Sequence, residues 1–275
     1  MIKDIFNLDK RVVVITGAAG LLGTHHAEAV AAFGGIPILI DLNKDKLESI
    51  SENLYKKYKA QSASYVVDIT NEDKIKKNVK EILSKFNKID SLINNAANNP
   101  KIEDGTDTNF SRLENFSIDN WNSDLNVSLT GSFLCSKHYG YEISKNKNGG
   151  TIINISSDLG LIGPDQSLYL KKGVPENLQS VKPISYSVSK AGMLGLTKYL
   201  STYWVNSNVR CNAICPGGIE NNQSEEFLAK IKKKIPLNRL AQANEYQGTL
   251  IWMLSDAASY LNGAIVSVDG GRTSW

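Results

Sequence analysis

Short, continuous hydrophobic runs alternate with longer amphipathic segments along most of this chain. Seven such runs consist mainly of β-branched and other apolar residues, at positions 11–15, 36–40, 63–67, 89–93, 151–155, 209–214 and 264–268. Runs of this length and composition are typical of strands that are buried on both faces of a parallel sheet. The hydrophobic pattern therefore predicts about seven parallel strands.

The segments between these runs have the periodicity of helices. We expect helices at about residues 21–33, 44–58, 73–86, 119–145 and from Tyr186 to about residue 206. Regular alternation of strand and helix predicts parallel strands joined by right-handed crossovers. A chain of 275 residues with 41% hydrophobic content is large enough for one such core. The predicted fold is α/β, a doubly wound parallel sheet of the Rossmann type that spans residues 1–275 as a single domain.

Two long polar segments interrupt the alternation, at residues 98–117 and 161–184. Each follows a predicted strand, so each should lie at the carboxyl edge of the sheet, where open α/β sheets bind their ligands. Such segments either wall a substrate pocket or are solvated loops, and the sequence leaves both possibilities open. Their polar residues favour a polar substrate over a fatty-acyl or steroid one. The polar residues in these segments, or just before the second of them, include Asn98, Asn99, Lys101, Asp104, Arg112, Asp158, Asp165, Gln166, Tyr169, Lys171 and Lys172.

Charge and composition exclude several classes of protein. The net charge is only +3, and the lysines form short runs on predicted helices instead of a basic stripe mixed with aromatic residues, so nucleic acid is not an expected partner. No apolar run approaches the ~20 residues of a membrane span or forms a signal peptide. The three cysteines, Cys135, Cys211 and Cys215, lie in predicted helix and strand contexts. We therefore expect reduced, packed thiols in a cytoplasmic protein with no membrane contact and no metal site.

A glycine-rich turn, TGAAGLLG at residues 16–23, joins the first strand to the first helix. Glycines let a backbone turn tightly there, and a pyrophosphate can then approach the free N–H groups of the helix N-terminus. The second strand ends at Asp41, at the distance where dinucleotide folds place an acidic residue on the adenosine ribose. A carboxylate there favours NAD over NADP because it repels a 2′-phosphate. Asp41 could instead cap the next helix, but the preceding glycine turn favours the cofactor role.

Tyr186 and Lys190 lie four residues apart in the run YSVSK, so on a helix they share one face. A phenol titrates near pH ~10, and a nearby ammonium lowers its pKa by stabilising the phenolate. The pair is therefore a candidate proton relay, although such pairs also occur by chance. The fifth strand ends at Ser156 and Ser157, which should face the same edge of the sheet.

Together these residues resemble the short-chain dehydrogenase/reductase family over about residues 10–271. The motifs that carry the resemblance are TGAAGLLG (16–23), Asp41, Asp68, NNAA (94–97), Asn126, NISS (154–157), YSVSK (186–190), CPGG (215–218) and VDGG (268–271). The resemblance implies an oxidoreductase that interconverts a secondary alcohol and a ketone by hydride transfer to or from NAD(P).

The resemblance also implies roles for individual residues. Tyr186 would be the acid/base, Lys190 would bind the nicotinamide ribose, Ser157 would bind the reacting oxygen and Asn126 would hold a water linked to Lys190. The cofactor would be bound by Gly17, Gly20, Leu22, Gly23, Asp41, Asp68, Ile69, Asn94, Ala96, Tyr186, Lys190, Pro216, Gly217 and Ile219. Asp158, Tyr169, Lys171, Lys172 and Arg112 are candidates for contacting the substrate.

The chain departs from the family pattern at three places. Leu21 stands where most short members have a glycine, so the spacing of Gly17, Gly20 and Gly23 matches the extended branch of the family. Ala97 replaces the last glycine of the NNAG motif, and the two polar segments are longer than in typical members. Length and the remaining motifs favour the shorter, single-domain branch.

Three functions are compatible with these observations. The first is an NAD-dependent oxidoreductase acting on a polar, sugar-like or sugar-phosphate molecule, because the tail GGRTSW and the long loops are similar to bacterial members from flagellin-modification and nonulosonic-sugar pathways. The second is a reductase of 3-oxoacyl thioesters, which Asp41 disfavours. The third is a non-catalytic nucleotide-binding regulatory protein, since fold alone does not guarantee activity. The resemblance also implies a homotetramer or homodimer that pairs through the two longest helices.

Overall fold

The computed structural model describes residues 2–98 and 108–275, and these residues contain one seven-stranded parallel sheet. Its strands lie in the spatial order β3-β2-β1-β4-β5-β6-β7, and every neighbouring pair is parallel. The strands are β1 (Val12–Thr16), β2 (Ile36–Asp41), β3 (Ala63–Val66), β4 (Ser91–Asn94), β5 (Gly150–Ile155), β6 (Val209–Pro216) and β7 (Ile265–Val268). The predicted α/β fold with about seven parallel strands is confirmed.

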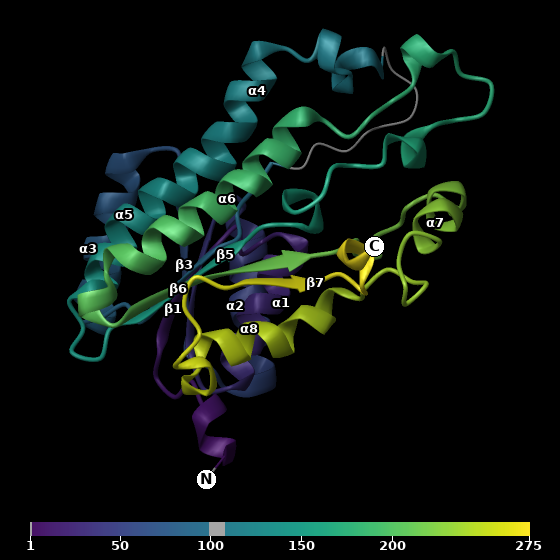
Figure 1. Cartoon of the computed structure of the whole chain (residues 1–275). Coiled ribbons are helices and arrows are strands. Elements are labelled where there is room, and N and C mark those ends of the chain that lie inside the picture. Colours follow the sequence, from purple (N-terminus) through teal and green to yellow (C-terminus); the bar gives the residue numbers. More distant parts are fainter. Residues whose placement is uncertain (1, 99–107) are drawn as a thin grey trace.

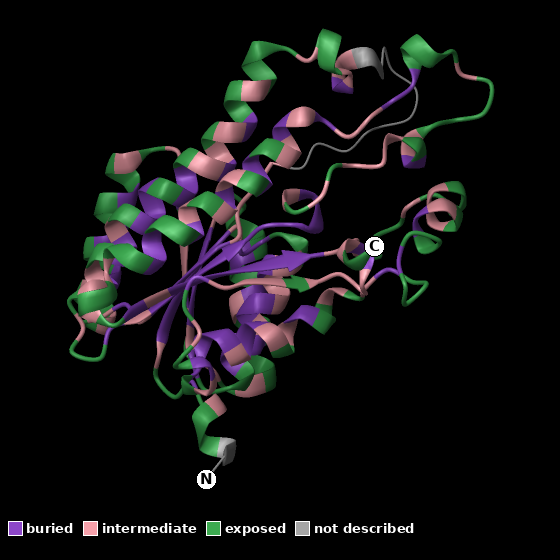
Figure 2. Ribbon diagram, in the orientation of Figure 1, coloured by how far each residue is buried: buried purple, intermediate pink, exposed green. Residues whose placement is uncertain are grey.

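Helices cover both faces of this sheet (Figure 1). One face carries α1 (Leu21–Ala32), α2 (Lys44–Tyr58) and α8 (Gln247–Leu254), and the other carries α3 (Glu72–Phe86), α5 (Gly131–Ser144) and α6 (Ile184–Tyr203). Two further helices, α4 (Ile118–Leu125) and α7 (Glu225–Lys232), lie beyond the carboxyl ends of the strands. Figure 2 shows the central strands buried, β7 at the edge of the sheet only partly buried, and the outer faces of the helices exposed.

The two faces of the sheet have separate hydrophobic cores because successive strand residues point in opposite directions. In β1, Val13 and Ile15 pack under α1, α2 and α8, whereas Val12 and Val14 pack under α3, α5 and α6. Burial on both faces explains why no polar residue alternates with the apolar ones between Val12 and Ile15. The three free cysteines are buried, as expected. Within the described ranges, none of the helices is both long and apolar enough to cross a membrane.

The helix predicted at residues 119–145 is not continuous. It consists of α4, a π-helical turn at Asn126–Thr130, and α5. A π-turn contains one more residue than an α-helical turn, so it changes which side chains face the sheet downstream. The sequence pattern did not reveal this change because Trp121, Phe133 and Tyr139 read as positions of one helix.

The strand order reverses between β1 and β4, where one crossover leads towards β2 and the other towards β5. Loops leaving the carboxyl ends of these two strands diverge and leave a crevice between them, which is the usual ligand site of open α/β sheets. The fold thus places the turns after β1, β4 and β5 around one opening.

His26, on the inner face of α1, is a buried imidazole that the packing holds neutral. It is only 1% exposed, and neither ring nitrogen has a hydrogen-bond partner among the described residues. Burial, with a smaller contribution from His25, lowers the pKa of His26 to about 3. An unfolded histidine titrates near pH ~6.5, so below that pH the unfolded chain binds a proton that the folded chain does not.

We therefore expect the free energy of unfolding to fall by about 1.4 kcal/mol between pH 7.5 and pH 5.5 because of His26 alone. His26→Leu should remove this part of the pH dependence, as measured by urea unfolding at both pH values. At pH 7.5 His26 is neutral in both the folded and the unfolded chain. The difference in unfolding free energy between the wild type and His26→Leu at that pH therefore gives the packing effect of leucine alone. The prediction would be contradicted if the free energy of unfolding fell equally for the wild type and for His26→Leu between pH 7.5 and pH 5.5.

Candidate active site

A cleft of about 510 Å³ opens at the carboxyl edge of the sheet, between the turn after β1 and the beginning of α6. It contains most of the residues that the sequence singles out. Those lining it are Gly17, Gly20, Leu22, Asp41, Asp68, Ile69, Ala96, Ser157, Tyr186, Lys190, Pro216, Gly217 and Ile219. The fold thus gathers residues from the whole length of the chain into one continuous site.

The glycine turn has the shape of a phosphate cradle. Gly17 has a φ of +64°, and a Cβ on it would lie 2.8 Å from the Cα of Ala96, so only glycine fits between the ends of β1 and β4. Gly23 does not line the cleft; a Cβ there would lie 2.1 Å from the carbonyl oxygen of Gly17, so its role is close packing of α1 against the turn. Gly20 precedes α1 and has no side chain to cover the first helical N–H groups. The turn therefore suits the pyrophosphate of a dinucleotide.

Two carboxylates beside this cradle are held in place by backbone N–H groups. Asp41 accepts hydrogen bonds from the N–H of Ala19 at 3.0 Å and from the N–H of Leu42 at 2.8 Å. It therefore links the end of β2 to the glycine turn, and it lines the cleft as well. Asp68 accepts from the hydroxyl of Thr70 at 2.7 Å and from its N–H, and these bonds lower the pKa of Asp68. Both groups are thus fixed acceptors on the cleft wall.

The side chains of Asn94, the last residue of β4, and of Asn95, the residue after it, point in different directions. The side chain of Asn94 is buried and donates to Ser136 at 3.0 Å and to Asn154 at 2.9 Å, so it points into the core and away from the cofactor cleft. Asn95 lines the cleft instead, and its amide donates to the carbonyl oxygen of Gly17 at 3.1 Å. Alternation of side chains along a strand explains why only one of two neighbours faces the ligand side.

Tyr186, Lys190 and Ser157 converge at the inner end of the cleft, as the sequence suggests. Lys190 Nζ lies 5.8 Å from the centre of the Tyr186 ring and donates to the carbonyl oxygen of Ile155 at 2.9 Å. Ser156 donates to the carbonyl oxygen of Lys190 at 2.7 Å. Ser156 therefore fastens α6 to β5, while Ser157 faces the cleft.

Burial dominates the electrostatics of this group. It lowers the pKa of Lys190 to about 8, with a further lowering by the charge of Lys182. It raises the pKa of Tyr186, against the opposing effect of a hydrogen bond with Ser157 and together with the charge of Asp158. The pKa of Tyr186 is therefore raised in the protein alone, in contrast to the lowering by Lys190 that the sequence led us to expect, because burial removes the phenolate from water.

Asn126 does not lie in this group, so the role expected for it is wrong as far as its position is concerned. It begins the π-turn between α4 and α5, is exposed, and lines a separate shallow depression with Asn122, Ser123 and Thr130. Its neighbour Val127 faces the cleft instead, and Ser128 is buried. The role of Asn126 was inferred from the family resemblance and not from helical periodicity, and in this π-turn it is Val127 that lines the cleft.

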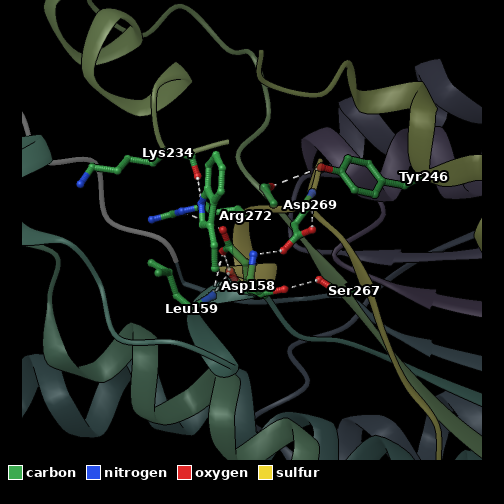
Figure 3. A network of polar contacts seen from close by, with 12 residues as sticks. Asp158, Leu159, Lys234, Tyr246, Ser267, Asp269 and Arg272 are labelled. Carbon is green, nitrogen blue, oxygen red and sulfur yellow. Dashed lines mark hydrogen bonds and ion pairs between the residues drawn. The ribbon is translucent and has the colours of Figure 1, made fainter. Parts of the chain in front are cut away.

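Two charged residues that sequence reasoning missed lie beside the catalytic group. Arg272, in the C-terminal tail, donates to the carboxylate of Asp158 at 2.6 Å, and both side chains are less than one-tenth exposed (Figure 3). The other oxygen of Asp158 accepts from the Ser157 hydroxyl at 2.8 Å and from the N–H of Leu159. Lys182 Nζ lies 3.8 Å from the centre of the Tyr186 ring, above its face. Neither residue has a sequence pattern that would identify it.

The residues proposed to contact the substrate differ in their surroundings. Asp158 is bound to Arg272 as described, and Tyr169 packs on Phe227 with ring centres 5.8 Å apart. Burial raises the pKa of Tyr169 to about 12. The guanidinium of Arg112 pairs with Glu114 and donates to the carbonyl oxygen of Glu176 at 2.8 Å, so it joins the two long polar segments.

Lys171 and Lys172 are exposed and do not line the cleft. The first long segment is described only at residues 98 and 108–117; Asn99, Lys101 and Asp104 lie outside the described residues.

Comparison with known proteins agrees with this geometry. Residues 17–273 match the family model described as "Enoyl-(Acyl carrier protein) reductase". A 3-oxoacyl-[acyl-carrier-protein] reductase of Aquifex aeolicus is 30% identical, with 96% of this chain and 98% of the relative covered. The post-translational flagellin modification protein A of Campylobacter coli is 29% identical, with the same coverage.

Among solved structures, a short-chain type dehydrogenase/reductase from Mycobacterium marinum superimposes with a TM-score of 0.84, at 24% identity and 99% coverage of both chains. That likeness concerns the fold, whereas the family model covers nearly the whole sequence, including the glycine turn, Tyr186 and Lys190. This chain belongs to the short-chain dehydrogenase/reductase family of oxidoreductases.

Proposed function

We propose that the protein is an NAD-dependent oxidoreductase that interconverts a secondary alcohol and a ketone of a polar, sugar-like or sugar-phosphate molecule. The observation that carries this proposal is the convergence of Tyr186, Lys190 and Ser157 in a cleft that continues to the glycine turn and Asp41. A family of oxidoreductases with this fold uses a nicotinamide cofactor, and the cradle formed by Gly17 and Gly20 fits its pyrophosphate.

The residues of the cleft have different roles in the proposed reaction. When bound, the cofactor gives or takes the hydride. The hydroxyls of Ser157 and Tyr186 bind the substrate oxygen and stabilise the negative charge that develops on it. Tyr186 moves the proton, and Lys190, held at 2.9 Å from the carbonyl oxygen of Ile155, keeps an ammonium near the phenolate.

Asp41 supports a preference for NAD over NADP. Its carboxylate is fixed at the end of β2 by the N–H groups of Ala19 and Leu42 and faces the part of the cleft next to the glycine turn. A 2′-phosphate placed there would meet a negative charge that is held in position and is only half-exposed. The following residue, Leu42, offers no positive charge to compensate.

The polar residues of the two long segments support a polar substrate. Our candidates for contacting it remain Tyr169, Asp158, Lys171, Lys172 and Arg112. Lys171 and Lys172 are the candidates for a phosphate that extends out of the cleft, because both are exposed. A sugar-like substrate is compatible with the name of the flagellin-modification relative.

Reduction of a 3-oxoacyl thioester is the second candidate, since a relative named for that activity is 30% identical. Asp41 and the polar segments count against it. A non-catalytic binding protein is less favoured, because Tyr186, Lys190 and Ser157 are arranged together in the cleft.

We also propose that the chain forms a homodimer or homotetramer through α5 and α6. Large apolar side chains are exposed on these helices at Phe133, Val188, Tyr199 and Tyr203. Exposed apolar groups on two adjacent helices of one face favour pairing with a second copy.

Replacing Tyr186 tests the reaction itself. With a substrate found by screening sugars and sugar phosphates, Tyr186→Phe should lower turnover by at least about 100-fold while the affinity for NAD changes little, because only the proton-transfer group is removed. Initial rates and NAD fluorescence titration measure the two effects, and Tyr55→Phe on α2 is the control. Turnover at the wild-type rate in Tyr186→Phe would show that the acid/base is misassigned.

Cofactor choice depends on the charge at position 41. Asp41→Asn keeps an oxygen that can accept hydrogen bonds but removes the charge, so the ratio of NADP to NAD affinity should rise about tenfold. Fluorescence titration with NADH and NADPH measures the ratio, with Asp45→Asn on the exposed first turn of α2 as the control. A wild-type protein that already binds NADPH more tightly would overturn the proposed preference.

If the chain assembles through α5 and α6, a charge inserted on one of these helices should lower the molar mass of the assembly. Tyr199 on α6 and Tyr55 on α2 are equally exposed, at 61%. Tyr199→Glu should lower the molar mass in light scattering because it places a carboxylate in the apolar interface, whereas Tyr55→Glu should not. Equal masses for both variants and the wild type would place the interface elsewhere, and a wild-type monomer would remove the proposal.

A further inference from the structure

The C-terminal tail brings a buried arginine back to the turn that follows β5 (Figure 3). Gly271 has a φ of +89°, and the carboxylate of Asp269 accepts from the N–H groups of Gly271 and Thr273 at 2.9 and 2.8 Å. These two bonds and the left-handed glycine bend the chain sharply after β7. Arg272, in this bend, is 9% exposed, and its Nη1 donates to Asp158 Oδ2 at 2.6 Å. The fold thus fixes the place of the guanidinium.

The two carboxylate oxygens of Asp158 have different partners. Oδ2 accepts from Arg272, whereas Oδ1 accepts from the Ser157 hydroxyl and from the N–H of Leu159, both at 2.8 Å. Both charged side chains are less than one-tenth exposed, so solvent screens their charges little. Neither Asp158 nor Arg272 lines the cleft, but Ser157 does. Arg272 is therefore connected to the cleft through Asp158 and Ser157.

A serine hydroxyl has a single proton, and in this structure Ser157 donates it to Asp158. The same proton has to turn towards the cleft to stabilise negative charge on a reacting oxygen there. An unpaired buried carboxylate would hold the proton firmly, because a hydrogen bond to an ionised acceptor is roughly twice as strong as one between neutral groups. Arg272 draws the negative charge of Asp158 towards Oδ2. The N–H of Leu159 still satisfies Oδ1 after the proton has turned.

The charge of Asp158 also acts on the phenol of Tyr186. Burial raises the pKa of Tyr186, the hydrogen bond with Ser157 lowers it, and the negative charge of Asp158 raises it further. A carboxylate without its arginine would oppose the phenolate more strongly, because the positive charge would no longer cancel part of its field. The other titratable groups on the elements around this phenol are Lys190 on α6, Tyr169 and Lys182 in segment 161–184, Asp124 on α4 and Cys215 at the end of β6.

Building on the proposed function, we propose that Arg272 is a positioning residue of the active site, which pairs with Asp158 and so holds the Ser157 hydroxyl at the cleft with its proton available to the reacting oxygen. Asp158, a candidate for contacting the substrate, then also supports Ser157. If the pair only anchored the tail to the turn after β5, its loss would lower stability without changing the ionisation of Tyr186.

The ionisation of Tyr186 gives a test that needs no substrate. Protein labelled with ¹³C at the tyrosine ζ carbon is titrated by NMR from pH 6 to pH 10.5, with and without NAD⁺, and the Tyr186 signal is the one missing from Tyr186→Phe. Arg272→Met should shift this titration to higher pH by about one unit, because Asp158 is unpaired, and Asp158→Asn should shift it to lower pH. The double variant Arg272→Met/Asp158→Asn should titrate close to the wild type.

Two further variants are the controls. Arg272→Lys keeps the positive charge, so it should titrate much closer to the wild type than Arg272→Met does. Arg11→Met breaks an ion pair with Asp256 that is also 2.6 Å long but lies at the amino ends of the strands, and it should leave the titration unchanged.

Turnover gives the second measurement, with a substrate from the screen of sugars and sugar phosphates. Oxidation of an alcohol needs Tyr186 as the phenolate, so the acid limb of the kcat/KM profile should move to higher pH in Arg272→Met and return in the double variant. In Arg272→Met kcat should also fall at least about tenfold, because the unpaired carboxylate of Asp158 retains the proton of Ser157. The affinity for NAD⁺ should change little, since neither charged residue lines the cleft.

The inference is overturned if Tyr186 titrates alike in the wild type, Arg272→Met and Asp158→Asn, including no titration in any of them, or if the double variant keeps the shift of Arg272→Met. If Tyr186→Phe abolishes turnover while Arg272→Met keeps the wild-type pH profile, the proposed function stands and the inference falls. If the wild type does not bind NAD⁺, the proposed function falls, and the NMR titration still shows whether Arg272 controls Tyr186. Thermal unfolding identifies the folded variants; should Arg272→Met not fold, the opposite shift of Asp158→Asn decides.

Discussion

The double attachment of Lys190 to the end of β5 is the contact on which the site depends. Its ammonium donates to the carbonyl oxygen of Ile155, and its own carbonyl oxygen accepts from the hydroxyl of Ser156. Two successive residues of the strand thus hold one residue of α6. Because Tyr186 lies one helical turn before Lys190 and Ser157 follows Ser156, the same attachment sets the phenol and the serine relative to each other. The packing is so close that a Cβ at Gly160 would lie 2.6 Å from Ser156 Oγ.

Burying that ammonium is costly, and the surroundings show how the protein tolerates it. A buried lysine loses its charge more easily than one in water, which is why the pKa of Lys190 falls to about 8.

Nearby, Arg272 and Asp158 form a buried ion pair that joins the C-terminal tail to the turn after β5. Asp269 orders that tail by accepting from the N–H groups of Gly271 and Thr273 (Figure 3). Asp158 also accepts from the hydroxyl of Ser157, so the tail helps to orient this serine at the cleft.

The sequence was sufficient to predict the parts of the site that depend on local periodicity. The strands were recognisable because both their faces are buried, and Tyr186 and Lys190 were paired because they are four residues apart on a helix. The role given to Asn126 came from the family resemblance alone, and a motif match does not show which side chains of the π-turn face the cleft. Arg272 and Lys182 were missed for another reason. Arg272 meets Asp158 across 114 residues of sequence, and Lys182 meets Tyr186 only through the path of an irregular segment.

The irregular segment at residues 161–184 is ordered by its own side chains, although many of its residues are exposed and none of them lines the cleft. Gln179 is buried and uses its side chain to bond the N–H and carbonyl groups of Lys171 and the carbonyl oxygen of Val174. Leu168 packs with Ile231 and Leu240. Polar side chains here replace the ladder bonds that a strand or helix would provide, because buried backbone groups need partners. A segment ordered in this way can present one charged side chain at a defined place. At Lys182 that place is the face of the Tyr186 ring, because its ammonium lies 3.8 Å from the centre of the ring.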